Sequence, residues 1–424
     1  MPALPVSWYT RLLMNKLFST DFFIGNRSVL RKLLPDGSLV VVTAHGLLQQ
    51  TADTTFPFRQ DSNFWYLTGI DEPDIILVLD GLQDYLIVPG RSDSRQAFDG
   101  AIEYGDLTKV SGSVDVMSEQ EGWKRLSEAL KKQSTVHGLP AAPSYIEQYG
   151  MYTNPARARL VERLHTWNSQ LTIEDIRGVL TNLRMVKQPA ELRAIQQAIN
   201  LTISGIEFVT EDEKLSSFVY EFDIESELTK RFRTTESGGH AFSPIIASGY
   251  SAVTLHNTTN NSKIPQNSLV VVDVGADVSH YAADITRTVG YGKPTPRQQD
   301  VYSAVLDVQD YALALLKPGT LLKEYEAQVE TYLGGKLQEL GLIKNVEREA
   351  VRKYYPHAAS HFLGLDVHDV GDYSRPLQEN MVVTCEPGIY IPEEDIGVRI
   401  EDDVLITPAG NRVLSAALAR RLTA

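Results

Sequence analysis

Two short apolar runs within residues 269–290, LVVVDVGADVSHYAADITRTVG, have the pattern of two β-strands joined by a polar turn. Asp273 lies inside the first run and Asp284 lies inside the second. Burying a carboxylate without a partner is very unfavourable. The placement of these two acidic residues therefore constrains the fold more strongly than any other feature of the chain.

The register of this hairpin decides whether the two acidic residues meet. A turn at residues 277–280 places Asp273 directly opposite Asp284 on one face of the sheet. Facing carboxylates repel each other unless a proton or a cation lies between them. A lone acidic residue in a strand is more often a solvated edge residue, so the inference depends on the pairing.

A second hairpin within residues 382–407, VVTCEPGIYIPEEDIGVRIEDDVLIT, has the same design. A turn at residues 392–395 places Glu386 opposite Glu401. Together the two hairpins present four carboxylates, and a pair of divalent cations would neutralise their charge. A bulge in either hairpin would change these pairings.

Strand alternation assigns faces to other residues of the second hairpin. Tyr390 and Arg399 face the same way as the two glutamates, whereas Cys385 faces away from them. A lone cysteine is usually a small buried hydrophobic residue. We therefore expect Cys385 to pack in the core and not to act as a nucleophile.

Histidines supply further candidate ligands. His357, His361 and His368 lie together in PHAASHFLGLDVHDVG, and His256 precedes the first hairpin. The spacing of the first two fits one face of a helix, but no glutamate follows His357 as in the HExxH motif of zinc peptidases. Carboxylates with one imidazole suit Mn²⁺, Co²⁺ or Zn²⁺, and two such ions can activate a shared water. The residues thus indicate a two-metal hydrolase.

The length of 424 residues predicts two domains. Apolar runs at 38–44, 74–81 and 84–90 are typical of an α/β unit, and the later hairpins alternate with helical patterns. We predict an α/β domain over residues 1–172, followed by an α+β domain over residues 173–424.

The formal net charge of −14 argues against nucleic acid or an anionic membrane as a partner. The sequence has no apolar run long enough to span a bilayer. The basic stretch 1–35 lacks the pattern of a signal peptide, and we interpret it as helix leading into the fold, with organellar targeting as the alternative. The single cysteine fits a reducing compartment, and we predict a cytoplasmic protein.

The motifs DVGADVSHYAADITRT, SHFLGLDVHDVG, TCEPGIYIP and GVRIEDDVLIT in combination resemble the metallopeptidase family with the pita-bread fold. The segment FRQDSNFWYLTGIDEPD (58–74) is similar to the N-terminal domain of the aminopeptidase P and prolidase branch. The resemblance implies an N-terminal domain of the creatinase/aminopeptidase P type before a pita-bread catalytic domain. It also implies that the first domain takes part in oligomerisation and substrate access.

The resemblance implies a ligand set for two metal ions, most simply Mn²⁺, with Co²⁺ or Zn²⁺ as alternatives. Asp273 would chelate one ion, and Asp284 and Glu401 would bridge both. His361 and Glu386 would complete the shell of the second ion.

Catalytic roles follow from the same resemblance. His256, His357 and His368 would line the pocket, bind the substrate and stabilise the oxyanion. Arg399 would orient the substrate or a ligand, and Glu386 would also transfer a proton to the leaving nitrogen.

The resemblance implies hydrolysis of the bond between an N-terminal residue and a following proline, by attack of a hydroxide that bridges the two metals. The partners would be peptides with proline at the second position, and the chain would form a homodimer or homotetramer. A dipeptidase restricted to Xaa-Pro is the first alternative. A non-catalytic peptide-binding member of the family is the second, and loss of metal ligands would be its signature.

Overall fold

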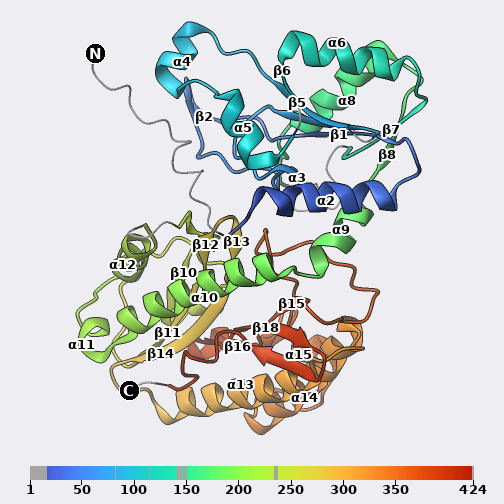
Figure 1. Ribbon diagram of the computed structural model, residues 1–424. Coiled ribbons are helices and arrows are strands. Elements are labelled where there is room, and N and C mark those ends of the chain that lie inside the picture. The colour runs from blue at the N-terminus through green and yellow to red at the C-terminus, as the bar shows by residue number, and fades with distance from the viewer. Residues whose placement is uncertain are drawn as a thin grey trace. The chain divides into compact units, whose positions relative to one another are not determined.

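The computed structural model describes residues 17–422, apart from residues 82, 114, 141–145, 147–149 and 234–236. The chain forms two compact units, Met1–Leu183 and Arg184–Ala424 (Figure 1). The predicted helix within residues 1–35 is present as α2 (Thr20–Leu33), and residues 1–16 of that stretch lie outside the described part.

The first unit is built on a six-stranded mixed sheet with the strand order β6-β5-β4-β1-β7-β8. The pairs β1–β4 and β4–β5 are antiparallel, and the other three are parallel. The strands of this unit are β1 (Leu39–Thr43), β2 (Gln49–Thr51), β3 (Thr54–Thr55), β4 (Ile76–Asp80), β5 (Gln83–Val88), β6 (Asp115–Ser118), β7 (Thr135–Gly138) and β8 (Thr172–Asp175). β2 and β3 form a separate two-stranded hairpin.

Helices cover both faces of this sheet (Figure 1). Alternate strand residues such as Val41, Val78 and Ile87 pack against Trp123 and Leu160 of two helices on one face. The described helices of the unit are α2 (Thr20–Leu33), α3 (Ser62–Thr68), α4 (Asp93–Asp99), α5 (Tyr104–Ser111), α6 (Glu119–Leu130), α8 (Ala156–Trp167) and α9 (Arg177–Met185), the last of which ends just beyond the unit. The predicted α/β character of this region is confirmed.

A buried arginine joins the elements on the other face. Arg27 of α2 forms an ion pair with Asp84 of β5, and it donates hydrogen bonds to the carbonyls of Leu67 (2.7 Å) and Ser111 (2.8 Å). These partners belong to or border α3, β5 and α5, so one guanidinium links three helices to the sheet.

The boundary between the two units lies further along the chain than the predicted boundary after residue 172. β8 begins at Thr172 and pairs with β7, so it completes the first sheet. The chain then runs through α9, and the second unit begins at Arg184.

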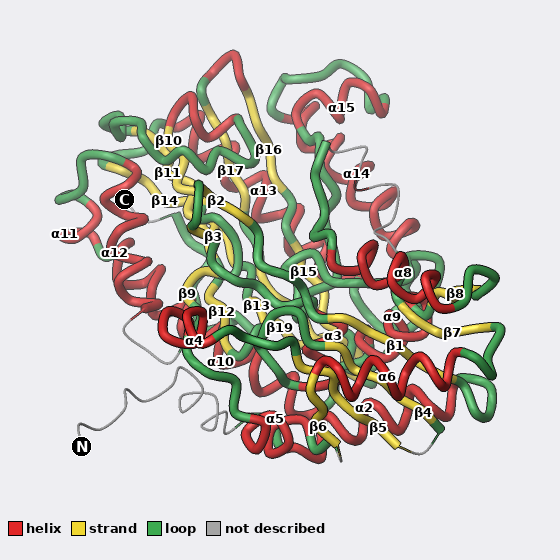
Figure 2. Tube along the Cα trace, turned by 90° about the horizontal axis from the view of Figure 1, so that it is seen from above, coloured by secondary structure: helices red, strands yellow, loops and turns green. Residues whose placement is uncertain are grey.

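The second unit is built from antiparallel hairpins that lie side by side. Its strands are β9 (Gly239–His240), β10 (Ile245–Ser248), β11 (Ser268–Val274), β12 (Ala276–Val278), β13 (Tyr281–Ala282), β14 (Ile285–Tyr291), β15 (Val382–Cys385), β16 (Gly388–Ile391), β17 (Ile396–Arg399), β18 (Asp402–Thr407) and β19 (Gly410–Val413). β17 contacts both β11 and β14, and these strands lie close together in Figure 2.

Helices pack against these hairpins. They are α10 (Pro189–Thr210), α11 (Asp212–Leu215), α12 (Glu221–Arg233), α13 (Pro296–Leu315), α14 (Leu322–Glu339) and α15 (Arg348–Tyr354), with short 3₁₀ turns η1 (Gly249–Val253) and η2 (Pro392–Glu394). α10 contacts β12 and β13, whereas α13 contacts β15, β16 and β17. The predicted α+β organisation is confirmed.

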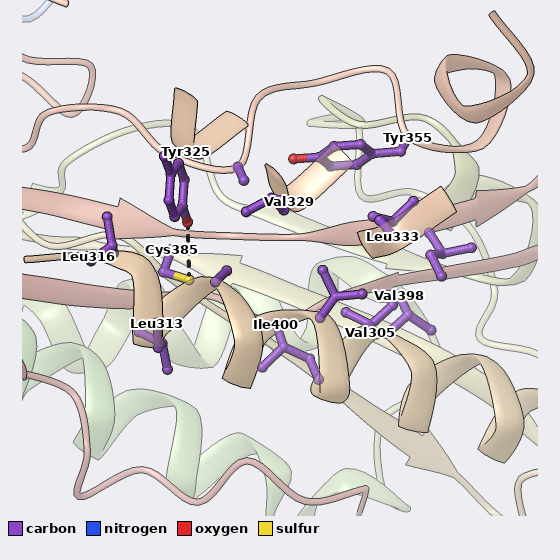
Figure 3. Packing of buried hydrophobic residues seen from close by; sticks show 14 of the residues in the cluster. Val305, Leu313, Leu316, Tyr325, Val329, Leu333, Tyr355, Cys385, Val398 and Ile400 are labelled. Atoms are coloured by element: carbon purple, nitrogen blue, oxygen red, sulfur yellow. Dashed lines mark hydrogen bonds between the residues drawn. The ribbon is translucent and has the colours of Figure 1, made fainter. Parts of the chain in front are cut away.

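An extensive core of the second unit lies between α13, α14 and the second hairpin (Figure 3). Val305 and Val329 face Val398 and Ile400, which alternate along the strands with the residues of the opposite face. Cys385 is buried in this core, and the hydroxyl of Tyr325 lies 3.6 Å from its sulfur. Burial raises the pKa of the thiol, so the structure confirms that Cys385 packs in the core.

The register of the first hairpin differs from the prediction. Asp273 lies opposite Thr286, not opposite Asp284, because the turn is centred one residue later, on Ser279 and His280. Both turn residues have positive φ, of 52° and 69°, although neither is glycine. Moving the turn by one residue moves each partner by two, so Asp273 and Asp284 stay on one face as diagonal neighbours.

The register of the second hairpin is confirmed. Cys385 pairs with Asp402, and Gly388 pairs with Arg399, so both ladders run in the register that sets Glu386 opposite Glu401. The glutamates themselves lie in the interruption between the two ladders. Neither glutamate is therefore part of a regular ladder.

Gly275 accounts for a similar interruption in the first hairpin. Its backbone lies so close to Ala283 that a Cβ atom at Gly275 would lie 1.7 Å from the Ala283 carbonyl oxygen. Ala283 and Asp284 lie between β13 and β14, which places the carboxylate of Asp284 outside the regular ladder. The close approach is therefore part of what positions Asp284.

No helix among the described residues is both long enough and apolar enough to cross a membrane. The predicted cytoplasmic location stays a prediction.

We expect Gly275→Ala to lower the free energy of unfolding by about 1–3 kcal/mol, because the backbone must move to admit the methyl group. Gly335→Ala is the matched control, since a Cβ there meets nothing within 4 Å in helix α14. The control should raise stability by up to about 1 kcal/mol through helix propensity. Chemical denaturation followed by circular dichroism measures both, and equal effects of the two variants would contradict the role given to Gly275.

Candidate metal centre

Four predicted acidic residues converge where the two hairpins of the second unit meet. Asp273 belongs to β11, Asp284 precedes β14, and Glu386 and Glu401 occupy the interruption in the second hairpin. Asp273, Asp284 and Glu401 are less than a tenth exposed. Backbone contacts hold the hairpins together, because the amide of Glu401 donates to the carbonyl of Thr286 at 3.1 Å.

His361 lies between the carboxylates of the two hairpins. Its Nε2 atom is 3.4 Å from an oxygen of Asp284 and 3.4 Å from an oxygen of Glu386. Ligand atoms of Asp284, His361 and Glu401 lie within 4.8 Å of one another. The Nδ1 atom of His361 lies 3.0 Å from the carbonyl of Phe362, and donation there leaves Nε2 with a free lone pair.

The carboxylates repel one another strongly. Burial, followed by the charges of Asp273, Asp403 and Glu386, raises the pKa of Asp284 well above its usual range. Burial and the charges of Asp284, Glu386 and Asp273 raise the pKa of Glu401 in the same way. A cation within the cluster would remove this cost.

Arg399 compensates part of this charge. Its guanidinium contacts Asp273 at 2.5 Å and donates to the hydroxyl of Tyr390 at 2.8 Å. Burial raises the pKa of Tyr390 to about 12, so this hydroxyl stays protonated. The other oxygen of Asp273, Oδ1, is buried without a hydrogen-bond partner among the described residues.

His357 lies beside this group in a loop after α15. The structure therefore does not place His357 and His361 on one helical face. Nε2 of His357 lies 2.9 Å from the hydroxyl of Tyr390, and its Nδ1 lies 2.7 Å from the carbonyl of Ala358. Burial and the charge of Arg399 lower the pKa of His357 to about 3, so the ring is neutral at physiological pH.

His368 lies in the same segment between α15 and β15 as His357 and His361, whereas His256 lies in the segment between η1 and β11. The ring centre of His368 lies 4.4 Å from that of His361, in an edge-on arrangement. Partial burial, His361 and His256 lower the pKa of His368 to about 4. His256 also contributes to the lowered pKa of His357. All the sequence-predicted site residues thus lie in one region of the second unit.

Three supporting residues were missed by the sequence analysis. The hydroxyl of Thr286 donates to Glu401 at 2.7 Å, and that of Thr384 donates to Glu386 at 3.2 Å. Asp403 accepts from the amide of Asp284 at 3.1 Å, and its Oδ1 atom is buried without a hydrogen-bond partner among the described residues. Each lies two positions from a predicted ligand, so strand alternation itself could have identified them.

The donor set fits hard divalent cations. Carboxylate oxygens dominate it, with one imidazole nitrogen available on His361. The orphaned oxygens of Asp273 and Asp403 lack the partners that buried polar atoms normally have. The residues therefore fit a metal centre better than a set of structural ion pairs.

Comparison with known families matches both parts of the chain. Residues 193–408 match the model of Metallopeptidase family M24. The chain belongs to metallopeptidase family M24. Residues 23–137 match the model of the aminopeptidase P N-terminal domain, which confirms the predicted resemblance for the first unit of this M24 protein.

Sequence similarity to known proteins extends over nearly the whole of this M24 chain. Human Xaa-Pro aminopeptidase 3 is 35% identical over 406 residues, which cover 89% of this chain and 78% of the relative. Escherichia coli Xaa-Pro aminopeptidase is 30% identical over 428 residues, which cover 95% of this chain and 96% of the relative.

The fold agrees with a solved structure of the same kind. The structure of E. coli aminopeptidase P with the inhibitor Pro-Leu superimposes with a TM-score of 0.85 at 28% identity. The match covers 95% of this chain and 96% of the other. The predicted pita-bread fold of the aminopeptidase P branch is thus confirmed.

In protein stripped of metal, we expect Asp284→Asn to become progressively more stable than the wild type as pH rises from 5 to 8. The raised pKa of Asp284 means that the folded state holds its proton more tightly than the unfolded state, so its contribution to stability is lost as pH rises. The asparagine has no proton to lose. Melting temperatures in a chelator measure the difference, and a constant gap across this pH range would contradict the assigned repulsion.

Proposed function

We propose that this chain is a metal-dependent Xaa-Pro aminopeptidase. The observation that carries the proposal is the buried cluster of carboxylates around His361, whose charge exceeds what Arg399 compensates. The names of the human and E. coli relatives support the substrate class. A non-catalytic family member is disfavoured because all five expected ligand positions are present and close together.

We assign the two-metal site to Asp273, Asp284, His361, Glu386 and Glu401. Manganese is the ion that we propose, and a Zn-substituted E. coli aminopeptidase P supports a divalent centre in this fold. Ions bound there would polarise the scissile carbonyl and lower the pKa of a coordinated water.

The chain's own residues prepare the reaction around that water. His357 and His368 are neutral at pH 7, since their pKa values are lowered to about 3 and about 4. The neutral imidazole of His368 can donate an N–H bond to the carbonyl oxygen as negative charge develops on it. His357 lines the pocket beside it, with its two nitrogens facing the Ala358 carbonyl and the Tyr390 hydroxyl. His256 completes this group, and Arg399 holds Asp273 and Tyr390 in place.

Hydrolysis forms a bond between the water oxygen and the carbonyl carbon, and it breaks the bond to the proline nitrogen. We assign Glu386 the transfer of the water proton to that nitrogen, which leaves as a neutral secondary amine. Proline lacks an N–H group and fixes φ, so a peptide bond before proline is a distinctive substrate.

A dipeptidase acting only on Xaa-Pro is the second candidate within the same family. The relatives and solved structures described above are Xaa-Pro aminopeptidases and aminopeptidases P, which favours the aminopeptidase. A homodimer or homotetramer and an oligomerisation role for the first unit stay predictions.

With added Mn²⁺, we expect the protein to cleave Xaa-Pro-Xaa tripeptides at least about tenfold more efficiently than Xaa-Pro dipeptides. A tenfold preference corresponds to about 1.4 kcal/mol of differential transition-state binding. Measuring kcat/KM for both peptides tests the assignment. Preference for the dipeptide would establish the second candidate, and a protein that neither binds divalent ions nor gains activity with Mn²⁺ would support the non-catalytic one.

Asp284→Ala and His361→Ala should each lower kcat by about a thousandfold or more, because each removes a proposed ligand of the metal centre. Glu339→Ala is a control that removes an exposed carboxylate from α14. Peptidase assays and metal analysis of the purified variants measure the effects. Wild-type activity in either ligand variant would refute the site.

A further inference from the structure

The segment 248–262 carries His256 and is closed at both ends onto a single buried side chain. That side chain is Glu221, the first residue of α12, and it is fully buried. It belongs to no part of the metal centre described above. Its sequence surroundings, FVYEFDIESEL, gave no sign of a functional role.

Both oxygens of Glu221 accept hydrogen bonds from this segment. Oε1 accepts from the amide of Ser248 at 2.8 Å, from its hydroxyl at 2.9 Å and from the hydroxyl of Ser251 at 2.5 Å. Oε2 accepts from the amide of Ser262 at 3.1 Å. The backbone amide of Glu221 donates to the carbonyl of Ser262 at 3.0 Å, so the residue clamps both ends of the segment.

Consecutive turns lead from this clamp to the histidine. The amide of Thr254 donates to the carbonyl of Ser251 at 3.1 Å, and the amide of Asn257 donates to the carbonyl of Thr254 at 3.2 Å. The amide of Thr258 then donates to the carbonyl of His256 at 3.0 Å. His256 itself is exposed, so these backbone turns, not packing of its ring, fix its position.

The clamped segment also rests on the hairpin that carries Arg399. A Cβ atom at Gly397 would lie 2.0 Å from the carbonyl oxygen of Ala252, so the two backbones are in direct contact. Asn260 secures the far side through a bond from the amide of Ile246 at 2.9 Å and a bond to the carbonyl of Pro244 at 2.9 Å. The segment is thus held against the hairpin that carries Arg399.

We propose that Glu221 is a positioning residue that holds His256 over the metal centre through its contacts with Ser248, Ser251 and Ser262. The effect on catalysis that follows from this positioning rests on the proposed function. The partners of Glu221 in this segment are hydroxyl and amide donors, which makes the carboxylate a four-way acceptor. Glutamine in its place would present an NH₂ group to some of these donors, and the clamp would loosen.

The Mn²⁺-loaded full-length protein tests this with Glu221→Gln, His256→Ala and the double variant. We expect Glu221→Gln to lower kcat on a Xaa-Pro-Xaa peptide by about tenfold or more with unchanged metal content, because small displacements of a catalytic group have large effects on rate. In the His256→Ala background, the same change should lower kcat by less than about twofold. An equal loss in both backgrounds, or loss of metal, would overturn the proposal.

Asp223→Asn is the matched control. Its carboxylate caps the same helix by accepting from the amides of Val219 and Tyr220, and these contacts lie outside segment 248–262. We expect it to leave kcat unchanged. If Glu221→Gln does not fold, Ser251→Ala replaces it, since it removes one donor to Glu221, and the same coupling to His256→Ala is required.

A measurement without substrate separates this proposal from the proposed function. In protein labelled at histidine, the His256 signal is assigned by its absence in His256→Ala. We expect Glu221→Gln or Ser251→Ala to shift or broaden this signal, and Asp223→Asn to leave it in place. An unchanged His256 signal in these variants would overturn the proposal even if the peptidase activity is established. If the signal shifts in the variants but the wild type has no peptidase activity, the positioning role is supported and the proposed function fails.

Discussion

The repulsion between buried carboxylates is the constraint on which the second unit depends. Asp273, Asp284 and Glu401 lie together with little access to solvent, and Asp403 is buried beside them. Like charges in such surroundings raise one another's pKa and oppose folding. The arrangement is maintained because the surrounding hairpins and helices bury enough apolar surface to offset that cost.

Asp402 and Asp403 are adjacent in β18, and their carboxylates have different surroundings. Asp402 points towards the helices, where Arg287 contacts it at 2.7 Å and Gln309 and Ser415 donate to it. Asp403 points the other way and keeps an oxygen without a hydrogen-bond partner among the described residues. The hydrogen bonds of Asp402 hold β18 in place, and Arg287 also donates to the carbonyl of Glu401. These contacts restrict the movement of the opposite side of the strand, which carries Asp403.

His357 and His368 border this negative region without adding positive charge, because the pKa of each is lowered by burial. His357 lies half-buried against Tyr390, and its lowered pKa keeps it neutral. Neutral rings can donate a hydrogen bond to a developing oxyanion without competing electrostatically with divalent cations for the carboxylates. The acidic centre is thus bordered by two neutral imidazoles, which is compatible with the metal-assisted hydrolysis proposed above.

The sequence by itself determined which residues share a face. The alternation of side chains along a strand has a period of two, so the partition of Glu386, Arg399 and Glu401 from Cys385 follows from position alone. It also determined the second register, since the acidic turn after Pro392 ends the strands where predicted. The first register was missed because Ser279 and His280 adopt positive φ without the glycine that normally marks such a turn.

Only the tertiary structure decided how the loops reach the centre. His357 and His361 have helical spacing, yet their chain is a loop fixed by contacts with Tyr390 and Phe362. The segment that carries His256 is bound through Ser248, Ser251 and Ser262 to Glu221, which lies far from it in the sequence, and no local pattern encodes such a contact. Spacing rules describe one strand or one helix at a time, whereas a metal centre depends on which separate elements the whole fold brings together.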